Sequence, residues 1–304
     1  MKQALMVAVM AIYGLAQPEK VVFDTDCAYF NDDGAALVLL LNSPKQVEIQ
    51  GITVVPGNYW PATGAPYMSH ILNLMHAVVP IYFGAQAPLL HSSAMAKKEQ
   101  GIEYLGAFAT DAPKYDGPIK AVDFLIETIE KSPGKITVLE IGPMTNLAIA
   151  LRLRPDLASK IGRLIFMGGA MHKKEFNFWF DPEAAQVVLR SAIAKKVMFG
   201  LEICERAPAI EITAKTPIGD LSRDDRKKNP SRFVWDVLPA EFLVDPKFVT
   251  KTETKYLDVD SVFGKNYGAV IPLDRSLAPD ATPVEMMMDL NFQRFAALYK
   301  SLIY

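Results

Sequence analysis

The chain has 304 residues, half of them hydrophobic, which is enough for one sizeable core. Its formal net charge is −2, so it lacks the basic excess expected of a protein that binds nucleic acid or an acidic membrane surface. Its two cysteines, Cys27 and Cys204, are too few for a disulfide framework and show no zinc-site spacing. We expect both to be free thiols packed as small hydrophobic residues.

The N-terminus has the order of a secretory signal peptide. One lysine comes first, an apolar run from Ala4 to Ile12 follows, and the small residues Gly14 and Ala16 come next. The run is short for a membrane span, which needs about 20 residues. We predict a signal peptide over residues 1–16 and a secreted or periplasmic protein. The alternative is a retained, buried N-terminal segment and a cytoplasmic protein.

Strand-like and helix-like segments then alternate along the chain. Short runs of β-prone residues predict strands over 20–24, 47–55, 79–83, 135–141, 163–167 and 196–201. Helical spacing lies between them, over 34–41, 66–77, 121–131, 146–152 and 182–191. This alternation predicts a single α/β domain over 17–304, with an open, mainly parallel, Rossmann-like sheet flanked by helices. The most polar stretch, 220–231, is predicted to be a solvated, flexible loop.

Polar and glycine-rich motifs follow several of the predicted strands. Asp24 ends the first strand, Gly57-Asn58 follows the second, and Gly142 and Gly168 follow later ones. Parallel α/β sheets bind ligands beyond the carboxyl ends of their strands. We therefore expect these motifs to form one shared site.

Four carboxylates, Asp24, Asp26, Asp32 and Asp33, lie within ten residues of one another. Such a group is tolerated when a cation sits among the carboxylates or when one of them is protonated. Calcium takes six to eight oxygen ligands, which this cluster can supply in part. Asp32 and Asp33 also open a predicted helix, whose N-terminus favours negative charge. A helix cap in an acidic surface loop therefore remains the alternative to a metal site.

The cluster also resembles a known family. Residues 24–37 (DTDCAYFNDDGAAL) resemble the signature of the nucleoside hydrolases. Further fragments that resemble this family follow in the same order, namely 57–58 (GN), 79–89 (VPIYFGAQAPL), 141–148 (IGPMTNLA), 166–169 (FMGG), 175–177 (EFN), 181–185 (DPEAA), 235–236 (WD) and 243–246 (LVDP). The resemblance spans residues 20–272 and implies hydrolysis of the N-glycosidic bond of ribonucleosides.

Carried over residue by residue, the resemblance implies a calcium ion held by Asp26, Asp33, Asp236 and the backbone carbonyl of Ile141. Asp26 would also act as the general base toward a calcium-bound water. Asp24 would not bind the ion itself but would help to orient the residues that do. The residues implied to contact the nucleoside are Asp32, Asn58, Met167, Glu175, Asn177 and Trp235.

The leaving base is the least determined part of the prediction. Trp235 stands where some members carry a histidine, and purine-preferring members resemble this chain in having tryptophan there. An indole stacks on a purine face, which favours purine nucleosides, although ordinary core packing also explains the residue. His172 lies in a loop near the implied sugar site, where it either approaches the base or is merely exposed.

Two other functions remain open. A magnesium-dependent haloacid-dehalogenase-type phosphatase would use Asp24 as its nucleophile after the first strand. A secreted, non-catalytic nucleoside- or sugar-binding protein of the same fold would explain the unusual residues between Asp26 and Asp32. The expected partner is a small-molecule nucleoside, without nucleic acid or membrane, and the family implies a homodimer or homotetramer.

Overall fold

The protein was analysed as a computed structural model. It describes residues 17–27, 29–99, 104–171, 173–210, 213–228 and 233–303. The predicted signal peptide and His172 lie outside these described ranges. Both cysteines are buried and free, as expected.

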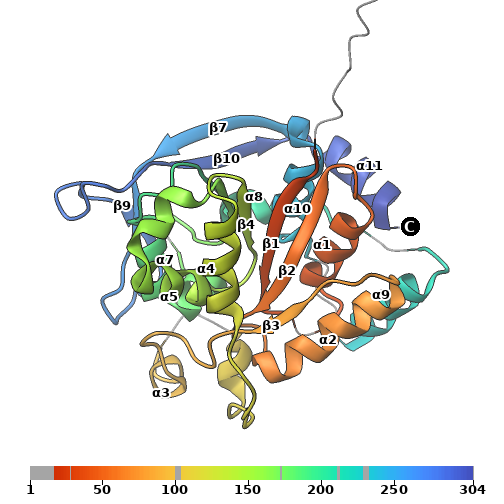
Figure 1. The fold of residues 1–304 in the computed structure, drawn as a ribbon, viewed down its shortest axis with the longest axis horizontal. Helices are drawn as coiled ribbons and strands as arrows, with labels where there is room; N and C mark the ends of the chain where they lie inside the picture. The colour runs from red at the N-terminus through yellow and green to blue at the C-terminus, as the bar shows by residue number, and fades with distance from the viewer. Residues whose placement is uncertain are drawn as a thin grey trace, which may run out of the picture.

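Eight strands form one sheet in the order β3-β2-β1-β4-β5-β6-β10-β7 (Figure 1). All neighbouring strands are parallel except β10 and β7, which are antiparallel. The strands of this sheet are β1 (Glu19–Thr25), β2 (Val47–Val54), β3 (Ile81–Phe83), β4 (Ile136–Glu140), β5 (Arg163–Met167), β6 (Lys196–Phe199), β7 (Val249–Lys255) and β10 (Val284–Leu290). A separate antiparallel pair is formed by β8 (Leu257–Val259) and β9 (Val270–Pro272).

Helices cover both faces of the sheet (Figure 1). The α-helices are α1 (Asp32–Leu41), α2 (Pro61–Leu74), α3 (Ser93–Ala96), α4 (Ala121–Lys131), α5 (Thr145–Leu153), α6 (Phe176–Phe180), α7 (Pro182–Leu189), α8 (Leu201–Cys204), α9 (Pro217–Lys228), α10 (Val237–Val244) and α11 (Phe292–Ile303). Three 3₁₀ turns complete the described elements, η1 (Gly106–Ala109), η2 (Pro155–Lys160) and η3 (Pro246–Phe248). None of the helices in the described ranges has the length and apolar character needed to cross a membrane.

Alternation along the strands builds two cores, one on each face of the sheet. In β1, Val21 and Phe23 join the core beneath α1, α2, α10 and α11, whereas Val22 joins the core beneath α4, α5 and α7. In β4, Leu139 and Val138 divide between the two cores in the same way. Successive strand residues point to opposite faces, so central strands must be apolar on both sides.

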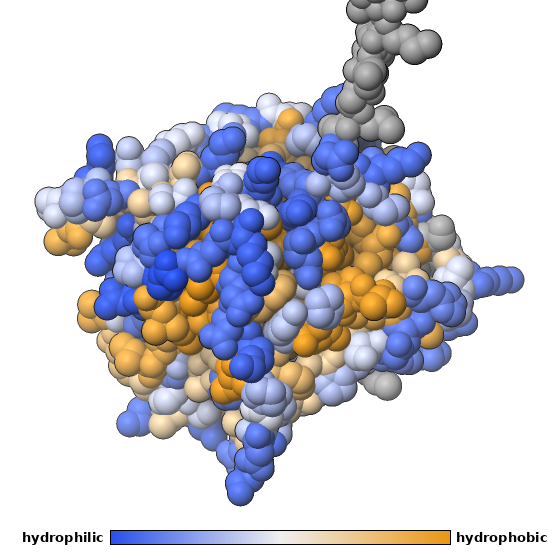
Figure 2. All heavy atoms as spheres, in the orientation of Figure 1, coloured by the Kyte–Doolittle hydropathy of each residue, from blue (hydrophilic) through white to orange (hydrophobic). Residues whose placement is uncertain are grey.

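Helix α4 shows how the outer layer is built. Ala121, Leu125 and Ile129 recur every four residues and are buried against the sheet, while Asp123 and Glu127 are exposed. Figure 2 shows this outer side of α4 as a hydrophilic strip with hydrophobic residues on either side of it. The 3.6-residue period that predicted the helix from the sequence therefore also sets which side faces the core.

Two sequence predictions need correction. Helix α2 begins at Pro61, five residues before the predicted start, because proline at the first helical position lacks only an N–H that would have no partner there. It ends before the predicted residue 77, since His76 adopts a positive φ of 51°. The prediction of a loop over 220–231 is wrong over its first part, which belongs to α9.

Candidate active site

The carboxyl ends of the strands open into one pocket of about 460 Å³. The segments that follow β1, β2, β4 and β5, together with the start of α10, supply most of its lining. The lining residues are Tyr29, Asn31, Asp32, Asn58, Tyr104, Ile141, Met167, Glu175, Phe176, Asn177, Phe233, Trp235 and Asp236. All predicted site residues line this pocket except Asp24, Asp26 and Asp33, which lie behind its surface.

Asp26 is held at both carboxylate oxygens by Asn58. The backbone N–H of Asn58 donates to Oδ2 (2.7 Å), and its side-chain amide donates to Oδ1 (3.1 Å). Gly57 permits this approach, because a Cβ at that position would lie 2.0 Å from Asp26 Oδ2. The glycine-asparagine pair after β2 therefore orients a carboxylate that ends β1.

Three carboxylates, Asp32, Asp33 and Asp236, present oxygen atoms that lie within 4.8 Å of one another. Asp32 also joins the starts of two helices, because its Oδ2 accepts the backbone N–H groups of Trp235 (3.0 Å) and Asp236 (3.4 Å). The group includes Asp32, which the resemblance assigned to ribose. Asp26, which the resemblance assigned to the metal, is not part of this closest group.

Burial raises the pKa of each of these carboxyls. For Asp26 the next cause is the negative charge of Asp33, and for Asp236 it is the charges of Asp32 and Asp33. Asp33 has its pKa raised to about 7, by burial and then by Asp32. A divalent cation would relieve both the repulsion and the loss of solvation, and the all-oxygen donor set fits a hard ion such as calcium. The residues present therefore fit the implied metal.

Hydrogen bonds from neighbouring side chains also hold Asp33. Thr25 Oγ1 donates to its Oδ1 (2.5 Å), and the Asn31 amide donates to its Oδ2 (2.6 Å). Asp24 lies deeper, fully buried, where its Oδ2 accepts from Thr53 (2.5 Å) and Asn146 (2.8 Å). These contacts leave Asp24 without access to the pocket, which argues against the phosphatase that would need it as a nucleophile.

The loop after β5 brings Glu175 and Asn177 into the pocket. Glu175 caps α6, and its carboxylate accepts backbone N–H groups from Gly169 (2.7 Å), Asn177 (2.9 Å) and Phe178 (3.1 Å). The Asn177 amide donates to the carbonyl oxygens of Ile141 and Met167, at 3.1 Å each. Glu175 thus shapes the loop, and Asn177 lies beside the carbonyl of Ile141 that was predicted to bind the metal.

Five of the lining side chains are aromatic, namely Tyr29, Tyr104, Phe176, Phe233 and Trp235. Phe233 and Trp235 stack with ring centroids 4.1 Å apart, and Tyr104 packs on Phe176 at 5.1 Å. The Tyr104 hydroxyl donates to the backbone oxygen of Asn58 (3.3 Å). A lining that combines carboxylates and amides with aromatic faces matches a ligand with a polyhydroxylated part and a planar part.

A buried ion pair supports Phe176, one of these aromatic residues. Phe176 packs against Trp179, whose indole N–H donates to Glu99. Glu99 also pairs with Lys174 at 2.6 Å, and both side chains are almost fully buried. The pair links Glu99 to Lys174, the residue that directly precedes Glu175.

The sequence analysis did not assign a role to Tyr104, Phe176, Phe233 or Asn31. Phe233 carried a weak signal, because it lies two residues before Trp235. Tyr104 gave none, since it follows a segment without a periodic pattern. It lies between α3 and η1, outside any helix or strand.

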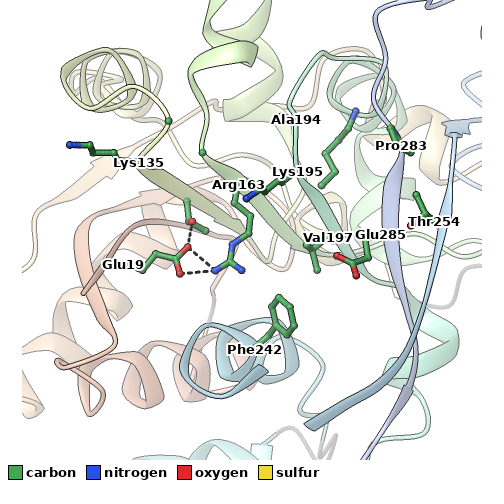
Figure 3. A pocket seen from close by; sticks show the side chains of 14 residues that line it. Glu19, Lys135, Arg163, Ala194, Lys195, Val197, Phe242, Thr254, Pro283 and Glu285 are labelled. Atoms are coloured by element: carbon green, nitrogen blue, oxygen red, sulfur yellow. Dashed lines mark hydrogen bonds and ion pairs between the residues drawn. The ribbon is translucent and has the colours of Figure 1, made fainter. Parts of the chain in front are cut away.

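A second hollow, of about 640 Å³, lies at the opposite edge of the sheet (Figure 3). Its Arg163 is already paired with Glu19, at 2.7 Å to both carboxylate oxygens. Figure 3 shows the Lys135 side chain directed away from this pair. The residues there do not converge on a common point, so the pocket at the carboxyl edge is the candidate active site.

A family model for the inosine-uridine preferring nucleoside hydrolases matches residues 21–297. The chain belongs to this family. It is similar to the pyrimidine-specific ribonucleoside hydrolase RihA of Shigella boydii serotype 4, with 34% identity over 90% of this chain and 95% of the relative. The match to RihA of Escherichia coli O9:H4 has 35% identity and spans about 60% of each chain.

Solved nucleoside hydrolases share the fold. A plant nucleoside hydrolase superposes with a TM-score of 0.75 at 24% identity, over 94% of this chain and 99% of the other. The inosine-uridine preferring enzyme from Bacillus anthracis gives 0.68 at 25% identity, over 94% and 98%. The predicted fold class, a single α/β domain with a mainly parallel sheet, is confirmed.

Proposed function

We propose that this nucleoside hydrolase family member hydrolyses the N-glycosidic bond of ribonucleosides to ribose and free base. The observation that carries the proposal is a pocket of about 460 Å³ whose lining combines carboxylates and amides with five aromatic side chains. Asp32, Asn58 and Asn177 supply the polar groups that ribose hydroxyls need. The five aromatic side chains supply faces on which a planar base can stack.

Asp33, Asp236, Asp26 and the Ile141 carbonyl would hold calcium, and Asp32 is close enough to share in this role. Calcium supplies an oriented water of lowered pKa. Asn58 fixes both oxygens of Asp26, which reduces the reorganisation needed when that carboxylate takes a proton from the attacking water. The surrounding carboxylates favour the positive charge that develops on the ribosyl ring as the bond to the base breaks.

The leaving base is proposed to depart from between aromatic faces. No histidine, lysine or arginine is among the lining residues within the described part of the chain. A base that stacks well and takes a proton from solvent therefore suits this pocket, which supports purine nucleosides. The stacked Phe233 and Trp235 pair favours this preference, while the RihA relatives are named as pyrimidine-specific.

The proposal is tested by incubating the protein with inosine, uridine and p-nitrophenyl riboside, with calcium and with a chelator. Release of base or nitrophenol that stops with chelator and returns with added calcium is expected, and inosine should be cleaved faster than uridine. Deoxyinosine is the matched control, because it lacks the 2′-hydroxyl. Tight inosine binding without turnover would instead identify a binding protein.

Localisation and assembly are proposed on the sequence and the family alone. We expect a mature protein that begins at residue 17 and is secreted or periplasmic, in the form of a dimer or tetramer. N-terminal sequencing and light scattering of protein isolated from its own cells would test both. An intact residue 1 in that material would overturn the proposed export.

A further inference from the structure

Helix α9 combines a charged exposed side with a buried polar residue. Ile218, Ser222 and Asp225 recur at helical spacing and are all buried. Asp224, by contrast, is exposed and forms a local ion pair with Lys227 at 2.8 Å. Only one side of the charged sequence is therefore solvated, and Asp225, 6% exposed, faces inward.

Asp225 contacts two distant parts of the chain. Its Oδ2 accepts the backbone N–H of Phe30 (2.5 Å) and the hydroxyl of Tyr67 in α2. Phe30 lies 195 residues away in the sequence. A carboxylate that accepts a backbone N–H forms a charge-assisted hydrogen bond, which is stronger than one between neutral groups.

Phe30 lies between two pocket residues, because both of its neighbours in the sequence, Tyr29 and Asn31, line the pocket. Tyr29 is one of the aromatic lining residues, and its ring packs edge-on against that of Tyr59, with centroids 6.3 Å apart. Asn31 donates to Asp33 Oδ2 at 2.6 Å. A hydrogen bond to the amide between them therefore constrains an aromatic wall residue and a partner of the acidic group together.

We propose that Asp225 is a positioning residue for the 29–31 turn, through which α9 sets the shape of the pocket without lining it. The kinetic part of this inference rests on the proposed hydrolase function. The structural part does not, because the order of the turn is measurable in a protein of any activity.

The test compares Asp225→Ala with Asp224→Ala, which removes the neighbouring exposed carboxylate from the same helix. In Asp225→Ala, hydrogen exchange at the Phe30 amide should accelerate at least about tenfold, because the acceptor is gone. KM for inosine should rise about five- to thirtyfold, with a smaller fall in kcat, because the turn shapes the pocket wall. Asp224→Ala should match the wild type in all three quantities.

Two further variants keep the test decisive. Tyr67→Phe removes the other donor and leaves the Phe30 bond, so its KM should stay within about twofold of the wild type. Asp225→Asn retains an oxygen acceptor of lower strength and should fall between wild type and Asp225→Ala, and it carries the test if the alanine variant does not fold.

An unchanged Phe30 exchange rate in Asp225→Ala, or in Asp225→Asn if the alanine variant is unfolded, would overturn the inference. So would a KM in Tyr67→Phe as high as in Asp225→Ala, because helix packing would then be the cause. If the wild type cleaves no nucleoside, the proposed function fails, and the exchange measurement alone decides the role of Asp225.

Discussion

Asp26 is the side chain on which the proposed chemistry depends most. It is buried, its pKa is raised first by burial and then by Asp33, and Asn58 holds both of its oxygens. Asp26→Ala should lower kcat for inosine by about 10²–10⁴-fold, the usual contribution of a general base. The melting temperature should not fall greatly, since the variant also removes a repelling buried charge. Activity within tenfold of the wild type would exclude Asp26 as the base.

Trp235 should decide how well different bases are held. Its ring stacks on Phe233, and both line the pocket. Trp235→Ala should raise KM for inosine about 3–10-fold, as expected from a lost aromatic stack, and should affect uridine less because its ring is smaller. Trp235→Phe is the matched control and should retain most of the preference. Equal losses for both nucleosides would show that Trp235 only fills the core.

Among single residues, the sequence predicted the pocket residues that belong to recognisable motifs. Asn58, Glu175, Asn177 and Trp235 all reach the pocket, because each follows a strand or opens a helix at the carboxyl edge. Tyr104 was missed because it lies between α3 and η1, outside any strand or helix whose pattern could place it.

Helix α10 carries an unpaired acid among apolar residues. Both carboxylate oxygens of Glu241 lack a hydrogen-bond partner among the described residues, and burial raises its pKa to about 9. The folded protein therefore binds this proton more tightly than the unfolded chain does. Stability is then present below about pH 4.5 and is lost as the pH rises toward 9.

Glu241→Gln should remove this pH dependence. The free energy of unfolding of the variant, relative to the wild type, should increase between pH 5 and pH 8 by nearly 4 kcal/mol, because the limit of about 1.4 kcal/mol per pH unit applies over three units. Urea titrations at the two pH values measure it, and Glu48→Gln, an exposed glutamate, is the control. A difference that does not change with pH would contradict the raised pKa.

Helices and strands with a clear repeat of buried apolar residues were predicted well, whereas the highly charged helix was not. The predicted bounds of α4 and β5 match the structure, because each has a clear buried pattern. Helix α9 was missed because its buried side includes Ser222 and Asp225, which a hydrophobicity pattern counts as solvated. Strands β7 and β10 lie beyond the predicted segments, and β7 is exposed along most of its length.

At the scale of the whole molecule, the acidic group couples metal binding to stability. The pKa of Asp33 is raised to about 7, so without a cation its contribution to stability falls as the pH rises from about 4 to 7. Calcium binding needs the deprotonated carboxylates, so the calcium-induced rise in melting temperature should be larger at pH 8 than at pH 5.5. Calorimetry with calcium and with chelator measures it. A larger rise at pH 5.5 would contradict a site built on these acids.

Asp32 contacts the backbone of Trp235 across 203 residues of chain, and this bridge joins the first helix to the tenth. An ion seated at such a bridge is held only after both distant segments have docked, and we predict that this docking follows the transition state for folding. Calcium should therefore extend the lifetime of the native state while leaving the refolding rate nearly unchanged, as expected for contacts that are absent from the transition state. Stopped-flow unfolding and refolding in denaturant would separate the two rates, and the ion would then slow unfolding by joining two segments that lie 203 residues apart in the sequence.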